Sequence, residues 1–205
     1  MPSRSRLIPR VGLVSFVALL AMTITSPVVH GQAQHVGWDI IKLSLPGSTV
    51  NAGGVASAKD NLGDTITLTG SGTFVAPAGG GGTSSAVTGG GRWTVCNAAG
   101  TVCSGGNYEV TGLVRWEEAP GTFPGTADNI SSPADFRARL AVLRIQYNDG
   151  AHGILVVSCH GAGTPDSVFE GITASKDFTD FWNRVAPSGT PSGPNANRTS
   201  FHVVK

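Results

Sequence analysis

Apolar residues recur mostly at every second position through the middle of this chain. The segments 38–45, 64–70, 92–96 and 108–116 follow this spacing, and 199–204 resembles a closing strand. A period of two is typical of a β-strand with one buried face. The pattern predicts an all-β fold of about eight to ten strands, either a β-sandwich or a jelly-roll-like domain, with a closed barrel as the second choice.

The clearest predicted hairpin covers residues 139–159, where two apolar β-branched runs flank Asn148-Asp149-Gly150. Asp-Gly supplies the positive φ angles of a tight two-residue turn. With Asp149 and Gly150 as that turn, Leu143 lies opposite Val156.

One short helix is expected over residues 175–184. Phe178, Phe181 and Trp182 follow the i, i+3, i+4 spacing of a helix, behind Ser175 as a capping residue.

Two stretches rich in Gly, Pro and Ser, 77–91 and 186–197, are predicted to be surface loops. Strand-like sequence resumes after each of them, so neither is a domain linker. We therefore expect a single domain over residues 34–205.

The first 33 residues have the order of a secretory signal peptide. Three arginines, at positions 4, 6 and 10, precede an uncharged run over 11–25, and Pro27 then leads to small residues. We expect cleavage after Gly31 or Ala33, which predicts a secreted or extracytoplasmic protein with no membrane span in the mature chain. The alternative is an uncleaved anchor over residues 11–29.

The charge of the chain bears on whether nucleic acid is a partner. Charged residues make up 13% of the chain and the net charge is +1. Removal of the leader takes three of the 14 basic residues and none of the 13 acidic ones. A slightly acidic chain argues against nucleic acid as a partner, because phosphate contacts need clustered Lys and Arg.

Three cysteines in a secreted chain are read first as disulfide chemistry. Cys96 and Cys103 bracket a short turn region between two predicted strands, so we expect a bridge that clamps a hairpin. Cys159 then remains as a buried thiol. Its alternative role is a nucleophile activated by His160, but adjacent strand residues point to opposite faces, which places this base badly.

Other chemical signals are weak. Residues 160–167 contain His160, Asp166 and Ser167, which with Cys159 are the weak catalytic candidates, yet the mature sequence has no G-x-S-x-G motif. His35, His152, His160 and His202 form no metal-binding motif, so no metal and no cofactor are expected. A zinc site that joins Cys159 to His160 or His202 across strands stays open as an alternative.

Four tryptophans offer a hint of binding. Trp38 and Trp182 are weak candidates for ligand contacts, whereas Trp93 and Trp116 occupy apolar-facing strand positions and are expected in the core. The leading hypothesis is a secreted, non-catalytic protein that binds an unknown extracellular ligand or protein. The alternatives are an extracellular enzyme with its site around 159–167, and a structural protein whose exposed strands pair with other chains.

Overall fold

The computed structural model describes residues 33–44, 48–77, 82–187 and 197–204, and these residues form an all-β fold, which confirms the predicted class. Thirteen strands belong to one continuous sheet, and the single helical element described is the 3-10 turn Pro133–Asp135. The strands are β1 (Gln34–Ser44), β2 (Thr49–Ala52), β3 (Ala56–Lys59), β4 (Thr65–Leu68), β5 (Ser71–Ala76), β6 (Val87–Cys96), β7 (Cys103–Ala119), β8 (Phe136–Tyr147), β9 (His152–Cys159), β10 (Gly171–Lys176), β11 (Thr179–Phe181), β12 (Asn183–Arg184) and β13 (Arg198–Val203).

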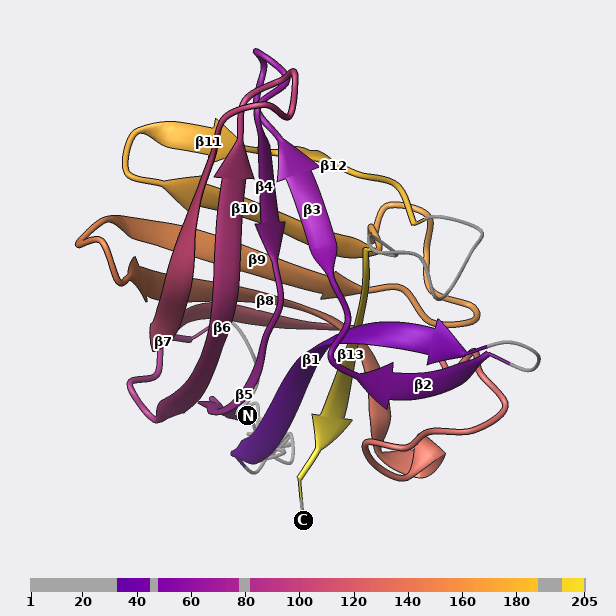
Figure 1. Cartoon of the computed structure of the whole chain (residues 1–205). Coiled ribbons are helices and arrows are strands. Elements are labelled where there is room, and N and C mark those ends of the chain that lie inside the picture. Colours follow the sequence, from indigo (N-terminus) through magenta and orange to yellow (C-terminus); the bar gives the residue numbers. More distant parts are fainter. Residues whose placement is uncertain (1–32, 45–47, 78–81, 188–196, 205) are drawn as a thin grey trace, which may run out of the picture.

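Six strands close into a ring, in the order β8, β13, β1, β5, β6, β7 and back to β8. β4, β3 and β12 continue the sheet from β6, while β9, β10 and β11 continue it from β8. In Figure 1 the strands β3, β4, β6 and β7 cross in front of β8, β9 and β10. The architecture is therefore a small closed barrel with extensions and not the expected sandwich of eight to ten strands.

The ring closes because long strands change partners along their length. β6 pairs with β5 up to Gly90 and with β4 from Trp93 onward. A Cβ on Gly90 would lie 2.1 Å from the carbonyl oxygen of Tyr108, and one on Gly91 would lie 1.9 Å from that of Thr69. Only glycine permits these approaches. The prediction of a loop over 77–91 was therefore wrong for residues 87–91, and residues 78–81 lie outside the described chain.

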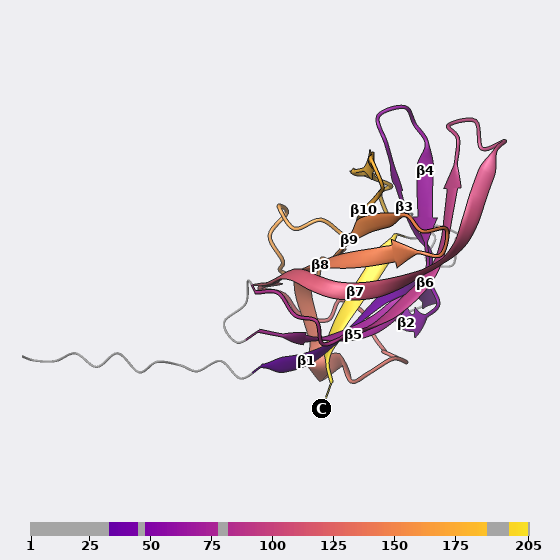
Figure 2. The same ribbon diagram turned by 90° about the vertical axis from the view of Figure 1, so that its left-hand side faces the viewer.

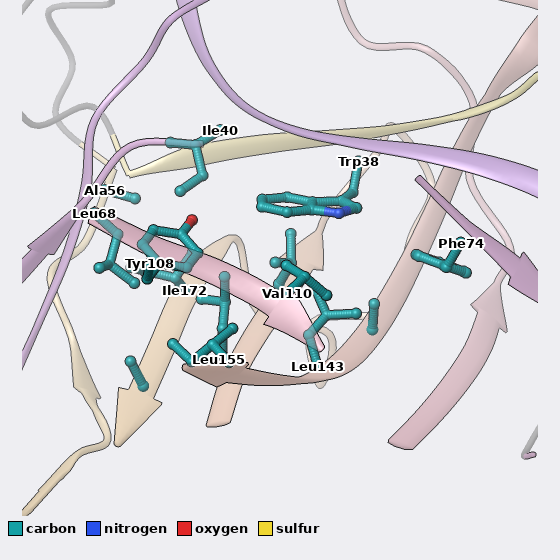
Figure 3. Packing of buried hydrophobic residues seen from close by; sticks show 14 of the residues in the cluster. Trp38, Ile40, Ala56, Leu68, Phe74, Tyr108, Val110, Leu143, Leu155 and Ile172 are labelled. Atoms are coloured by element: carbon teal, nitrogen blue, oxygen red, sulfur yellow. The ribbon is translucent and has the colours of Figure 1, made fainter. Parts of the chain in front are cut away.

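Aromatic side chains fill the interior of the six-stranded barrel. Phe74 and Phe201 each meet the indole of Trp116 edge to face, with centroids 4.9 and 5.1 Å apart. Trp93 and Trp116 are buried, as expected. Trp38 has no exposed area, and Figure 3 shows its indole within the buried cluster, above Val110 and Leu143.

The hairpin of β8 and β9 exists, but its predicted register was wrong by one residue. Leu143 pairs with Leu155 and not with Val156. Three residues, Asn148 to Gly150, form the turn, because the amide of Tyr147 donates to the carbonyl of Ala151 and Gly150 adopts a φ of 91°. A three-residue turn shifts the register by one position and turns Leu155 to the core.

The helix expected over 175–184 was also wrong, because this segment contains the hairpin of β10 and β11. Asp177 takes a positive φ of 50° at the turn, and Lys176 pairs with Thr179. Phe181 is buried, whereas Phe178 is fully exposed, so the three aromatic residues do not share one face.

Cys96 and Cys103 form the predicted disulfide, which joins the end of β6 to the start of β7. The turns that follow β3 and β6 project together at the top of Figure 2, and the amide of Ala98 donates to Asp64 Oδ1 at 2.9 Å between them. The predicted leader, apart from residue 33, and residues 188–196 of the second loop lie outside the described chain. Within the described chain, no helix is long and apolar enough to span a membrane.

Candidate functional site

The candidate site lies on the outer face of β1 and β13. Trp38 and Phe201 pair across these strands and point into the barrel, so the alternating positions point outward. On β13 the outward residues are Arg198, Ser200 and His202. Ile41 and Asp39 of β1 lie opposite Arg198 and Ser200 on that same face.

A cavity of about 150 Å³ lies between this outer face and the connection from β7 to β8, which runs beside β2 in Figure 1. Its walls are mainly apolar, and its polar groups come from β13 and from the segment that follows β9. The apolar wall consists of Ile41, Leu43, Val50, Phe123, Pro124 and Phe136, while the polar lining includes Cys159, His160, Glu170, Arg198 and Ser200.

Each outward residue of β13 carries one buried polar atom without a hydrogen-bond partner among the described residues. These atoms are Nε of Arg198, Oγ of Ser200 and Nδ1 of His202. Ser200 is only 1% exposed, and both Ser200 and Arg198 line the cavity. Burial of a hydroxyl without a partner costs about 1–3 kcal/mol. Such a cost recurring on one strand face marks this face as a functional candidate.

Glu170 brings a carboxylate to the same cavity. Its two oxygens accept hydrogen bonds from the amides of His160, at 2.6 Å, and Thr199, at 2.7 Å. Burial nevertheless raises the pKa of Glu170 from 4.5 to about 7, and these two amides and Arg198 only partly offset that effect. A carboxyl group that titrates near neutral pH in a cavity is a candidate for ligand binding or proton transfer.

The structure brings Cys159 and His160 to the cavity, but not as a nucleophile and its base. Burial and then the charge of Glu170 raise the pKa of the Cys159 thiol well above its ordinary value. His160 directs Nδ1 to the carbonyl oxygen of Val168, 2.7 Å away. Asp166 and Ser167 are exposed and do not belong to the described cavity lining.

A buried hydrogen bond between His202 and Asp128 holds the connection that contributes Phe123 and Pro124 to the apolar wall. His202 Nε2 lies 2.7 Å from Asp128 Oδ2, and both side chains are almost fully buried. Burial raises the pKa of the neighbouring Asp39 to about 6; His202 lowers this pKa and Asp128 raises it. Since Asp128 belongs to the same connection as Phe123, this hydrogen bond fixes the connection against β13.

The two tryptophans proposed for ligand contacts lie elsewhere. Trp38 is enclosed in the core, while Trp182 is 60% exposed and donates from Nε1 to Asn61 Oδ1 at 3.2 Å. Two larger hollows lie near the hairpin ends, but key polar groups there are already paired. Asn148 Oδ1 accepts hydrogen bonds from Trp93 Nε1 and from the amide of Asn107, and Lys176 pairs with Asp149.

Sequence reasoning missed Glu170, Arg198 and Ser200. The available signal was the alternation along β13, which places Arg198, Ser200 and His202 on one face. Among the described residues, no group of three or more His, Cys, Asp or Glu side chains is arranged to hold a metal ion. No protein-family model, curated protein or solved structure matches this chain.

Proposed function

We propose that this chain is a secreted protein that acts by binding, and that it takes a compact, largely apolar group into the cavity between β13 and the β7–β8 connection. The observation that carries the proposal is an apolar cavity with a buried hydroxyl, that of Ser200, and no described partner for it. Ligand sites typically combine mainly apolar walls with a few polar groups. The disulfide is compatible with an oxidising compartment, and the leader supplies the route of export.

Size limits what enters. A cavity of 150 Å³ lined by apolar side chains accommodates about one six-membered ring, and drug-sized ligands need roughly twice that volume or more. The occupant is therefore a small molecule or one end group of a larger partner.

A hydrolytic enzyme is the second candidate, and the raised pKa of Glu170 favours it, because general bases act best near their own pKa. Two observations weigh against it. The only described thiol in the cavity is held protonated by burial, and no described hydrogen bond joins Ser200 or Cys159 to a histidine. A binding role therefore explains the cavity without requiring an activated nucleophile and its base.

Two variants on β1 test the cavity directly. Leu43 is half-buried and lines the cavity, whereas Lys42 is exposed on the opposite face of the strand. Binding of 2-phenylethanol is measured by calorimetry and by thermal shift. We expect the natural chain and Lys42→Trp to bind and Leu43→Trp to lose binding, because its indole fills the cavity. Equal binding by both variants would refute the proposed function.

A further inference from the structure

We propose that the ligand of this cavity is a carboxylate on a compact apolar body, with its oxygens held by Arg198 Nε and Ser200 Oγ. This inference rests on the proposed function and names the chemical class of its ligand. Two sources share this chemistry: a free aromatic or branched carboxylic acid, and the C-terminal carboxylate of a partner whose last residue is apolar.

The unpaired groups of the cavity call for an acceptor. Arg198 Nε carries an N–H, and Ser200 carries a hydroxyl that can donate; neither has a partner among the described residues. The two residues stand two positions apart on one strand, about 7 Å, so their side chains can converge on one group. A carboxylate offers two acceptor oxygens and the negative charge that complements a guanidinium.

Thr199 and Glu170, two other polar residues of the lining, are already hydrogen-bonded. Thr199 donates its hydroxyl to the carbonyl of Ser158 at 2.6 Å, and both oxygens of Glu170 accept backbone amides. Glu170 is the one carboxylate of the described lining that a ligand cation could contact, and the positive charge of Arg198 would repel that cation. The arrangement of free donors therefore favours an anion over a cation.

The apolar wall defines the rest of the ligand. Phe123 and Phe136 meet edge to face with centroids 5.6 Å apart, and Leu43 and Val50 complete the wall. A phenyl ring or a branched chain of similar size fits beside these side chains. Phenylacetate combines such a ring with a carboxylate.

Glu170 makes this binding dependent on pH. The charged or titratable groups around it are Arg198 of β13, Arg184 of β12, and Cys159 and His160 at the end of β9. When Glu170 is neutral, it does not repel the ligand carboxylate, so affinity for an acid falls as the pH rises through about 7.

The experiment compares phenylacetate with 2-phenylethanol, which keeps the ring and lacks the charge, on the full chain by calorimetry at about pH 6. We expect phenylacetate to bind at least about tenfold more tightly, since a charge-assisted hydrogen bond is worth that factor or more. Arg198→Gln should reduce the ratio to near one, whereas the control Lys42→Gln, on the opposite face of β1, should keep it. Equal affinities in the natural chain would overturn the carboxylate inference while leaving the proposed function standing; failure of both ligands would remove both.

A peptide arm separates the two sources. A pentapeptide ending in Phe is tested with a free and with an amidated C-terminus. Tighter binding of the free-acid peptide than of phenylacetate assigns the ligand to a protein C-terminus, and weaker binding assigns it to a free acid. If the amidated peptide matches the free-acid peptide while phenylacetate shows no preference over the alcohol, the carboxylate class is rejected.

Discussion

Replacing Ser200 with alanine should make the protein more stable. Most buried polar side chains have a hydrogen-bond partner, and removing such a side chain destabilises the fold because the partner is left unpaired. Ser200 is 1% exposed and its hydroxyl has no hydrogen-bond partner among the described residues. The change therefore removes a desolvation cost without removing a described bond.

The size of the effect follows from that cost. An unpaired buried hydroxyl costs about 1–3 kcal/mol. A hydrogen bond from this hydroxyl to water in the cavity offsets part of that cost. We expect Ser200→Ala to raise the free energy of unfolding by about 1 kcal/mol. For a domain of this length, such a gain raises the melting temperature by about 2–4 °C.

Ser57 is a matched control. It is equally buried on a strand, but its hydroxyl lies 2.7 Å from the hydroxyl of Thr67 and forms a hydrogen bond with it. Ser57→Ala should lower the free energy of unfolding by about 1 kcal/mol. Urea unfolding at constant pH measures both variants, and the slopes of the two transitions show whether the unfolded states are comparable.

A loss of stability in Ser200→Ala would contradict this prediction. If Ser200→Ala destabilises as much as Ser57→Ala, then the hydroxyl has a partner in the folded protein in solution. Ser200 Oγ would then not be a free donor for a ligand, and the inferred carboxylate class would be wrong. A gain in stability together with weaker binding of phenylacetate would support both the absence of a partner for the Ser200 hydroxyl and its role in binding the carboxylate.

Three further predictions address the pH response, the disulfide and the barrel seam. The pKa of Glu170 is raised from 4.5 to about 7 in the folded protein. The contribution of Glu170 to stability is therefore complete below pH 4.5 and is lost as the pH rises through 7. Glu170→Gln should remove up to about 3 kcal/mol of this pH dependence, measured by urea unfolding across that window. Replacing Cys96 and Cys103 together by serine should cost about 2–3 kcal/mol by loop entropy, with unchanged ligand affinity, and unchanged stability would contradict it. Gly90→Ala should prevent folding or cost more than about 4 kcal/mol by circular dichroism, whereas Gly112→Ala, whose Cβ would have 3.7 Å of clearance, should cost about 1 kcal/mol or less.

Local sequence patterns were sufficient for some features of the fold. The alternation of apolar residues predicted an all-β chain, and the short spacing of Cys96 and Cys103 predicted their bridge. Both features depend on residues close together in the sequence. A strand shows its two faces by itself, and a hairpin needs only its own turn.

Closure of the barrel depends on contacts that no local pattern contains. β13 completes the ring by pairing with β1, although their paired residues Trp38 and Phe201 are far apart in the sequence. The glycines at 89–91 have a loop-like composition, yet their lack of a Cβ allows β6 to cross close to other backbones. The stripe at Phe178, Phe181 and Trp182 fits a helix equally well until the pairing of β10 and β11 decides against it.

The candidate site was hidden for the same reason. Glu170 precedes β10 and reaches the amide of Thr199 on β13, so the two become neighbours only after the sheet has formed. Asp166 and Ser167 lie close to His160 in the sequence, but both are exposed and neither belongs to the cavity lining. Of the four candidates from this segment, only Cys159 and His160 line the cavity.

The distribution of costly groups connects stability with function in this chain. The barrel interior packs Trp38, Phe74, Trp116 and Phe201 together, and of these only Trp38, through Nε1, has a buried polar atom without a described partner, whereas the outward face of β13 has such an atom at each of its three outward positions. Asp39 and Glu170, the two carboxyl groups with raised pKa values, lie beside that same face. An apolar side chain at these positions would stabilise the fold more. Because such costs persist where a site requires them, their gathering on one face favours a ligand there over a purely structural role.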